Sequence, residues 1–225
     1  MEMFKYGKAI LSQQTEGVWS GALPVYMEEI PAHKAPVIHW SGPKIPRFLW
    51  SQIKAFMLWT HEEYGGEAQV RLYYNAKKDH WQAIVMPQWI SHSLTTDEVP
   101  DHPWRLNAFA CVPATDGWEP CGTVHHHDTS SAFQSGKDKN DEKDQHGLHI
   151  TLGHIDKQKW DWDARVTFSG LFYAIDPTEW FEDDIKVVCK AAKETETFPK
   201  MWRKHMIKKE YKAPAQVSYV GGYNQ

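Results

Sequence analysis

Cysteine is scarce in this sequence. Its 225 residues contain three cysteines, Cys111, Cys121 and Cys189, and no Cys-x-x-Cys pair. An odd number of cysteines without such a pair argues against a disulfide framework and against a zinc site made of cysteines alone. We therefore expect the chain to work in a reducing, cytoplasmic setting.

Long apolar runs and an excess of basic residues are also lacking. No segment approaches the roughly eighteen uninterrupted apolar residues that a membrane span needs. The first residues, MEMFKYGKAILSQQTEG, have no small-residue cleavage site, so we expect no signal peptide. The formal net charge is −4, which does not favour binding to nucleic acid or to an anionic membrane.

Apolar and aromatic residues are plentiful. Hydrophobic residues make up 41% of the chain and tryptophan occurs 12 times, which is enough to build a core. The length suits one domain with appendages. We expect a turn-rich amino-terminal extension over 1–46, a core domain over 47–180, and carboxy-terminal helices with a flexible tail over 181–225.

The hydrophobic pattern predicts both helices and strands. From Arg47 to Glu63, apolar residues that include Phe48 recur at helical spacing, with Pro46 before them and Gly65 after them. Further strands are expected over 36–40, 68–75, 81–87, 120–127, 148–155 and 165–175, and further helices over 183–193 and near 200–209. This order predicts an α+β or mixed α/β domain, with a largely antiparallel sheet flanked by helices.

Three successive histidines end one of the predicted strands. Side chains two apart on a strand point the same way, so His125 and His127 would converge on one side and His126 would face the other. A His-x-His pair at a strand end can hold zinc. Histidine pairs also occur on ordinary surfaces, so the neighbouring residues have to support this interpretation.

Ser135 and Asp138 follow the histidines closely. They share one face if the chain begins a helical turn here, and Asp138 could then reach back as a third ligand. Two histidines and one aspartate leave a position for water, as in a catalytic zinc site, where zinc lowers the pKa of that water to about 7. Ser135 could donate a hydrogen bond to the oxyanion that forms on a carbonyl carbon under attack.

Such a site also needs a general base within reach of the water. The sequence offers Glu62, Glu63 and Glu67 upstream of the histidines. A carboxylate at the start of a strand beside the histidine-bearing strand would suit this role.

Together these residues resemble the JAMM motif of the JAB/MPN metalloproteases. That motif is His-x-His followed by Ser-x-x-Asp, with a glutamate upstream, and here seven residues separate His127 from Ser135, the usual spacing. The resemblance covers roughly 47–176, including the helix before the glutamate and the strand that Gly122 leads into the histidines.

The resemblance implies a fold, a cofactor and an activity. The JAB/MPN fold is a curved mixed sheet flanked by helices. One Zn²⁺ would be held by His125, His127 and Asp138, with Glu67 as general base and Ser135 as oxyanion donor. The implied activity is that of a zinc-dependent metallopeptidase or isopeptidase on a protein or peptide substrate, with the scissile bond at the end of a ubiquitin-like protein.

Two positions depart from the family pattern or leave it ambiguous. Asp128 stands where the family usually has proline, which changes the loop and adds a charge near the metal. Glu63, which precedes Gly65-Gly66, matches one family variant, whereas Glu67 fits the start of the strand. We favour Glu67 over Glu63.

Two other functions are compatible with these residues. One is an MPN-type scaffold that binds partners without turnover, against which the complete ligand set argues. The other is a phage or cell-wall peptidase, which the lack of a secretion signal makes less favoured. Substrate specificity would come from loops such as 89–119 and 139–146, and from the tail.

Several residues near the motif are expected to have ordinary roles. Solvated loop charges are expected at Asp128, Asp141, Glu142 and Asp144, and packing or surface roles at His149 and His154. Cys121 is expected to be a small buried residue. Among the tryptophans, Trp104 and Trp118 are candidates for a cleft rim.

Overall fold

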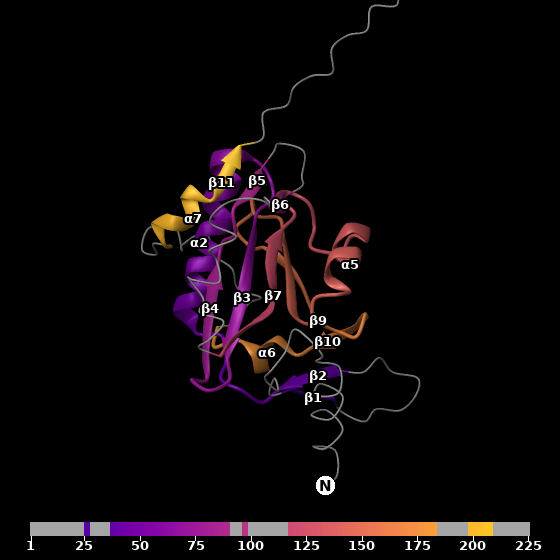
Figure 1. The fold of residues 1–225 in the computed structure, drawn as a ribbon. Coiled ribbons are helices and arrows are strands. Elements are labelled where there is room, and N and C mark those ends of the chain that lie inside the picture. The colour runs from indigo at the N-terminus through magenta and orange to yellow at the C-terminus, as the bar shows by residue number, and fades with distance from the viewer. Residues whose placement is uncertain (1–24, 28–36, 91–95, 99–116, 184–197, 209–225) are drawn as a thin grey trace, which may run out of the picture.

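The structure is a computed structural model that describes residues 25–27, 37–90, 96–98, 117–183 and 198–208. A curled sheet with helices around it forms the body of the molecule (Figure 1). In chain order the elements are β1 (Val25–Met27), β2 (Val37–Trp40), α2 (Arg47–Tyr64), β3 (Gln69–Asn75), β4 (His80–Ile84), β5 (Gln88–Ile90), β6 (Thr96–Glu98), β7 (Trp118–His126), α5 (Gly136–Glu142), β8 (Gly147–Gly153), β9 (Asp161–Phe168), β10 (Leu171–Ile175), α6 (Pro177–Trp180), α7 (Lys200–Lys204) and β11 (Met206–Lys208).

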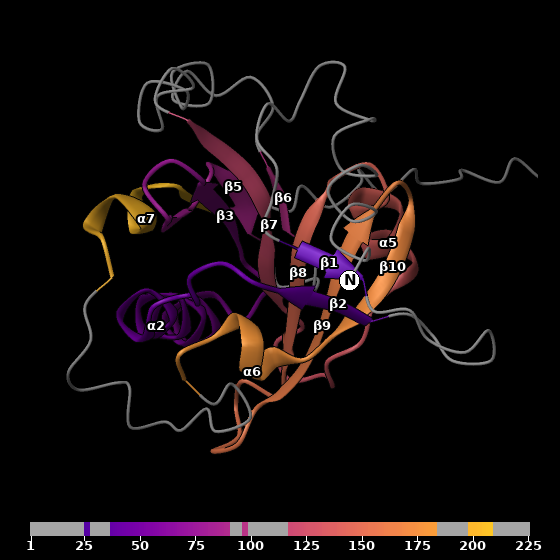
Figure 2. The same cartoon turned by 90° about the horizontal axis from the view of Figure 1, so that it is seen from below.

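The main sheet has eight strands in the order β1-β2-β10-β9-β8-β7-β3-β4. β7 runs parallel to β8, and β2 runs parallel to β10, while the other neighbouring strands are antiparallel. The twist of successive strands makes the sheet curl, as the view from below shows (Figure 2). A smaller sheet, ordered β11-β5-β6, lies beside one end. The predicted α+β class and the largely antiparallel sheet with flanking helices are therefore confirmed.

The helix α2 confirms the prediction over 47–63. It ends at Gly65, which has a left-handed φ of 59° and whose N–H donates to the carbonyl of His61. The helix contacts β4 and β7 of the sheet. Its side chains Ile53 and Phe56 are fully buried in the core, and each contributes about 1.5–3 kcal/mol of burial free energy. Phe48 was expected on this apolar face but is 71% exposed, because it lies about 140° around the helix from Ile53.

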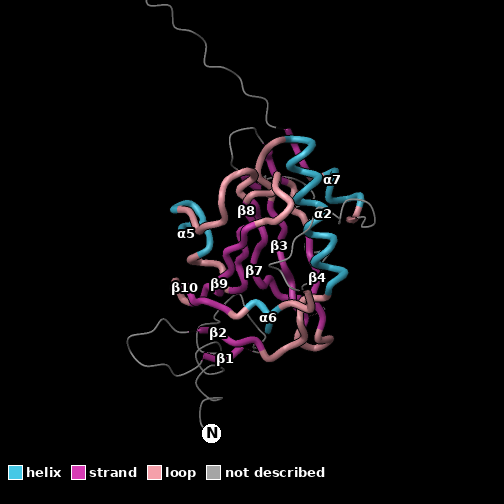
Figure 3. The backbone as a smooth tube through the Cα atoms, turned by 180° about the vertical axis from the view of Figure 1, so that it is seen from behind, coloured by secondary structure: helices cyan, strands magenta, loops and turns pink. Residues whose placement is uncertain are grey.

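The central strands have two unlike faces, because side chains alternate along a strand. On one face Val70, Val124 and Ile150 are fully buried in the core on which α2 packs. The opposite face of the same strands carries polar side chains, among them His125 and Thr151. The helices α2 and α5 lie on opposite sides of the sheet (Figures 1 and 3), so α5 lies over the polar face.

Two glycines let β7 and β8 approach each other closely. A Cβ on Gly122 would lie 1.8 Å from the carbonyl oxygen of Leu148, and one on Gly147 would lie 2.3 Å from the carbonyl of Cys121. Both residues have positive φ, at 124° and 137°. The register of β3 on β7 also shifts here, between Leu72 and Tyr73. The two glycines therefore fix how closely β7 lies against β8 just before β7 reaches the histidines.

Two of the predicted elements differ from the structure. The single strand expected over 165–175 is wrong, because the chain turns at Ser169 and Gly170, with φ values of 53° and 75°, and β10 folds back on β9. The helix expected near 200–209 ends at Lys204, and β11 follows it because Met206–Lys208 pairs with β5, the middle strand of the smaller sheet.

Other expectations fall wholly or largely outside the described residues. These are the helix over 183–193, most of the loop over 89–119 and the tail beyond 208. Within the amino-terminal extension, β1 and β2 join the main sheet beside β10. Among the described helices, none is long and apolar enough to cross a membrane.

Candidate metal centre

The strand β7 ends at the three histidines and places them as the alternation predicts. Gln69 of β3 pairs with His125, and Thr151 of β8 lies on its other side. The His126 ring lies on the α2 side, where Nε2 is 3.1 Å from the Thr60 hydroxyl. His126 is fully buried, and burial lowers its pKa to about 3. His126 is therefore a neutral core residue, and His125 and His127 face the polar side of the sheet.

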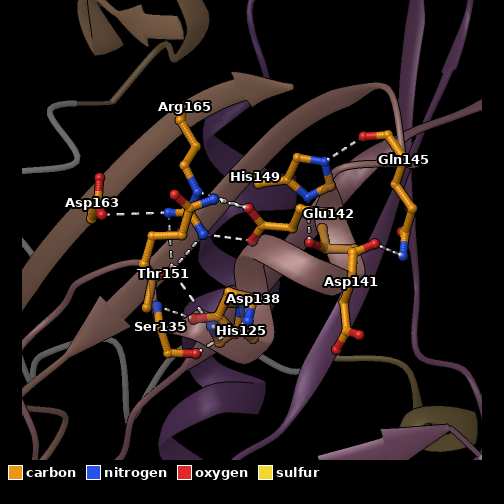
Figure 4. Close-up of polar contacts among 12 residues, drawn as sticks. His125, Ser135, Asp138, Asp141, Glu142, Gln145, His149, Thr151, Asp163 and Arg165 are labelled. Carbon is orange, nitrogen blue, oxygen red and sulfur yellow. Dashed lines mark hydrogen bonds and ion pairs between the residues drawn. The ribbon is translucent and has the colours of Figure 1, made fainter. Parts of the chain in front are cut away.

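The turn that carries Asp138 is fixed by its own capping contacts. Ser135 is the N-cap of α5, and its Oγ accepts from the Asp138 N–H at 3.1 Å. In return, Oδ2 of Asp138 accepts from the Ser135 N–H at 2.7 Å. This reciprocal capping box satisfies two backbone donors of the first turn. It also confirms that a helical turn begins at Ser135 and orients the Asp138 carboxylate toward β7 (Figure 4).

The structure brings together the three residues that the sequence singled out as ligands. The Nε2 atoms of His125 and His127 are 3.2 Å apart. Oδ1 of Asp138 is 3.4 Å from the first nitrogen, and Oδ2 is 3.4 Å from the second. A tetrahedral zinc ion with bonds of about 2.0–2.1 Å places neighbouring ligand atoms about 3.3 Å apart. The donor set and its spacing therefore fit a zinc ion.

Electrostatics favour an ionised carboxylate at this site. Burial alone would raise the pKa of Asp138, but hydrogen bonds with His125 and His127 hold it well below its usual range. Burial lowers the pKa of His127, but the hydrogen bond with Asp138 and the charge of Glu67 outweigh this effect and raise it. The His127 ring also hydrogen bonds the Ser131 backbone, a contact that orients a ligand through its second nitrogen.

Glu67 lies beside this group, just before β3. Gln69 pairs with His125, and the His126 N–H donates to the Ala68 carbonyl at 3.3 Å. Continued by two residues, this register sets Glu67 opposite His127, on the same face of the sheet. Burial raises the pKa of Glu67 to about 7, although His127 opposes the shift. Glu63, the other candidate base, is an exposed residue in the last turn of α2.

A second polar layer, which the sequence reasoning missed, supports His125 and α5. Oγ1 of Thr151 is 3.4 Å from Nε2 of His125, and both terminal nitrogens of Arg165 are 3.3 Å from the same hydroxyl. Arg165 also forms a buried ion pair with Glu142 of α5. The expectation that Glu142 is a solvated loop charge is therefore wrong. The alternation of polar and apolar residues along β8 was a signal for the polar face that holds Thr151, but not for the pairing of Glu142 with Arg165.

Asp128 is also not the solvated loop charge that the sequence suggested. It is 7% exposed, and its carboxylate pairs with the imidazole of His61 at the end of α2. Its φ of 51° is left-handed, a conformation that aspartate tolerates better than most residues. Its carbonyl accepts from the Ile155 N–H at 2.9 Å. Asp128 thus joins α2 to the loop after His127.

The remaining residues near the motif have the ordinary roles that were expected. His149 is buried, with Nδ1 2.8 Å from the Thr123 hydroxyl, and burial lowers its pKa to about 4. Nε2 of His154 lies 3.2 Å from a carboxylate oxygen of Asp161. Cys121 is fully buried, and burial raises the pKa of its thiol. Asp141 and Asp144 are exposed, as predicted. Trp118 is described and half-buried, whereas Trp104 lies outside the described residues.

Phe133 is a further residue that sequence reasoning missed. Its side chain is 50% exposed, and its ring meets the His127 ring edge to face, with the ring centres 4.9 Å apart. An exposed aromatic ring against a candidate ligand offers an apolar contact to any chain that approaches the site.

The chain was compared with known proteins. No protein-family model matches it, and no curated protein does. Among solved structures it is similar to the solution structure of protein DSY2949 from Desulfitobacterium hafniense, with 16% sequence identity and a TM-score of 0.38, over 58% of this chain and 89% of that chain. This likeness is too weak to assign a family or a function, so the site itself has to carry the functional argument.

Proposed function

We propose that the protein is a JAMM-type zinc metallopeptidase with a JAB/MPN fold. One observation carries the proposal. Two histidines on the end of a strand lie with their Nε2 atoms 3.2 Å apart, and an aspartate in the first turn of the next helix places a different carboxylate oxygen 3.4 Å from each of these nitrogens. Resemblance to the motif and the spacing that zinc requires thus agree on the same residues.

The chemistry that follows can be divided among the residues of the site. His125, His127 and Asp138 would hold the ion. A zinc ion bound there supplies Lewis acidity, which polarises a carbonyl and makes water acidic at neutral pH. Glu67 accepts a proton from the attacking water and passes it to the leaving nitrogen.

Ser135 has a second role besides capping α5. Its oxygen accepts a hydrogen bond from the Asp138 N–H, which leaves the hydroxyl proton available to donate. That proton can stabilise the oxyanion formed on the carbonyl carbon under attack.

The substrate class in this proposal comes from the resemblance. We propose a peptide or isopeptide bond at the carboxyl end of a ubiquitin-like protein, and a cytoplasmic setting in keeping with the cysteine content. An extended chain end of this kind would pass the exposed ring of Phe133 as it reaches the site.

The first test is the zinc content of untagged protein, measured by mass spectrometry beside Asp138→Ala. We expect about one zinc per chain and its loss in the variant. The zinc-loaded protein is then offered linear and isopeptide-linked ubiquitin-like fusions. Absence of zinc after reconstitution would contradict the metal centre, whereas zinc without cleavage of any fusion would favour a binding scaffold.

A further inference from the structure

Glu142 and Arg165 form a buried ion pair behind the candidate metal centre. Their side chains are 5% and 6% exposed. Nε of Arg165 donates to Oε2 of Glu142 at 2.8 Å, and a terminal nitrogen donates to Oε1 at 2.5 Å. This two-point contact fixes direction as well as distance, because a guanidinium and a carboxylate are both planar. The pair joins the last residue of α5 to the middle of β9 (Figure 4).

The helix α5 contacts the strands through Asp138 in its first turn and through Glu142 at its end. It spans seven residues, GKDKNDE, and Glu142 is the buried one among them. Gln134, just before the N-cap, also donates to Oε2 of Glu142 at 2.9 Å. Both ends of the segment that carries Asp138 therefore converge on one carboxylate, and Arg165 anchors that carboxylate to β9.

Arg165 reaches the metal centre by a second route. Both its terminal nitrogens lie 3.3 Å from Oγ1 of Thr151, which is itself 3.4 Å from Nε2 of His125 (Figure 4). One guanidinium thus contacts the helix that bears one candidate ligand and the threonine beside another. The ion pair and the metal centre share the polar face of the sheet.

We propose that Glu142 and Arg165 are positioning residues, which hold Asp138 and His125 at the separation that a metal ion requires. This inference rests on the proposed metal centre. A buried ion pair is weak as a source of stability, because desolvation offsets its attraction. The pair instead supplies a directional contact at the end of α5, where Glu142 is the buried side chain. Groups that orient metal ligands typically change metal affinity by roughly 10–100-fold when they are removed.

Four proteins test this role: wild type, Glu142→Gln, Arg165→Lys and the control Val166→Ala. Glutamine removes the charge but keeps the shape, and Asp163, 3.4 Å from Arg165, still faces the guanidinium. Lysine keeps the charge but lacks the planar fork. Val166 is buried on the apolar face of the same strand, so its truncation weakens β9 without touching the pair.

Zinc affinity is measured by competition with a chromophoric chelator. We expect Glu142→Gln and Arg165→Lys to bind zinc roughly 10–100-fold more weakly than wild type, and Val166→Ala to bind as wild type does despite a lower melting temperature. Wild-type affinity in both pair variants would overturn the inference while leaving the metal centre in place. Absence of zinc binding in all four proteins would overturn the metal centre itself.

Amide hydrogen exchange in the metal-free proteins gives a readout that does not depend on zinc. If the pair holds α5, amides of 136–143 exchange faster in Glu142→Gln and Arg165→Lys, but not in Val166→Ala. Unchanged exchange over this segment in the pair variants would overturn the positioning role, even where their zinc affinity has fallen.

Discussion

Replacement of Glu67 by glutamine should stabilise the metal-free protein at neutral pH. Burial raises the pKa of Glu67 from its ordinary value of 4.5 to about 7. Between these two values the folded protein keeps a proton that the unfolded chain has lost, so the free energy of unfolding falls as pH rises. The shift corresponds to at most about 3 kcal/mol, and solvent screening of this partly exposed carboxylate reduces that figure. Glutamine has a similar shape and never ionises, so it avoids this loss.

The assay is urea unfolding in the presence of a chelator at pH 5 and pH 7.5. The gain in free energy of unfolding from Glu67→Gln should grow from under about 1 kcal/mol at pH 5 to about 1–3 kcal/mol at pH 7.5. Glu63→Gln is the matched control, because Glu63 is exposed. That control should stay within about 0.5 kcal/mol of wild type at both values.

The same substitution separates zinc binding from catalysis. Zinc-loaded Glu67→Gln should keep its metal and lose roughly 10²–10⁴-fold in turnover, because the general base is gone. Glu63→Gln should keep both metal and turnover. Full activity in Glu67→Gln would show that another group is the base. If the difference in free energy of unfolding between Glu67→Gln and wild type were the same at pH 5 and pH 7.5, the argument from burial would be refuted.

Three further substitutions probe the surroundings of the site. Ser135→Ala should cost about 1 kcal/mol in free energy of unfolding through the lost cap, and roughly 10²–10³-fold in turnover. Ser135→Thr should retain both the cap and the turnover. Gly122→Ala should lower the free energy of unfolding by about 3 kcal/mol or more, since its Cβ would lie 1.8 Å from the Leu148 carbonyl oxygen. The control is Gly136→Ala, where a Cβ meets nothing within 4 Å, and it should change the free energy of unfolding by under about 1 kcal/mol. Burial lowers the pKa of His149 from 6.5 to about 4. As pH falls through this interval, the free energy of unfolding of wild type should therefore fall by up to about 3 kcal/mol more than that of His149→Gln. Parallel pH dependence of the two proteins in urea unfolding would contradict this.

Much of the candidate site could be predicted because its parts are local. A strand places His125 and His127 on one face whatever surrounds it, and a helical turn places Ser135 and Asp138 on one face in the same way. The end of the helix at Gly65 was predictable for a similar reason, since a glycine that follows a segment with apolar residues at helical spacing favours a left-handed C-cap.

The wrong expectations share a different physical cause. The polar stretches around Asp128 and Glu142 predict solvated charges, yet each of these residues is buried against a partner from another element. The partners are His61 and Arg165. The strand expected over 165–175 was divided by a tight turn. The turn depends on which neighbour each half pairs with, and neither the burial nor the pairing can be read from residue spacing.

The sequence by itself determined which side chains share a face: His125 with His127, Ser135 with Asp138, and the apolar side of α2. The tertiary structure alone decided which faces meet. It folded α5 onto the polar side of the sheet, set Glu67 near His127 and Asp138, and buried Glu142 against Arg165. The reason is that backbone geometry repeats over a few residues and is written into local spacing, whereas contacts between distant elements depend on the packing of the whole chain.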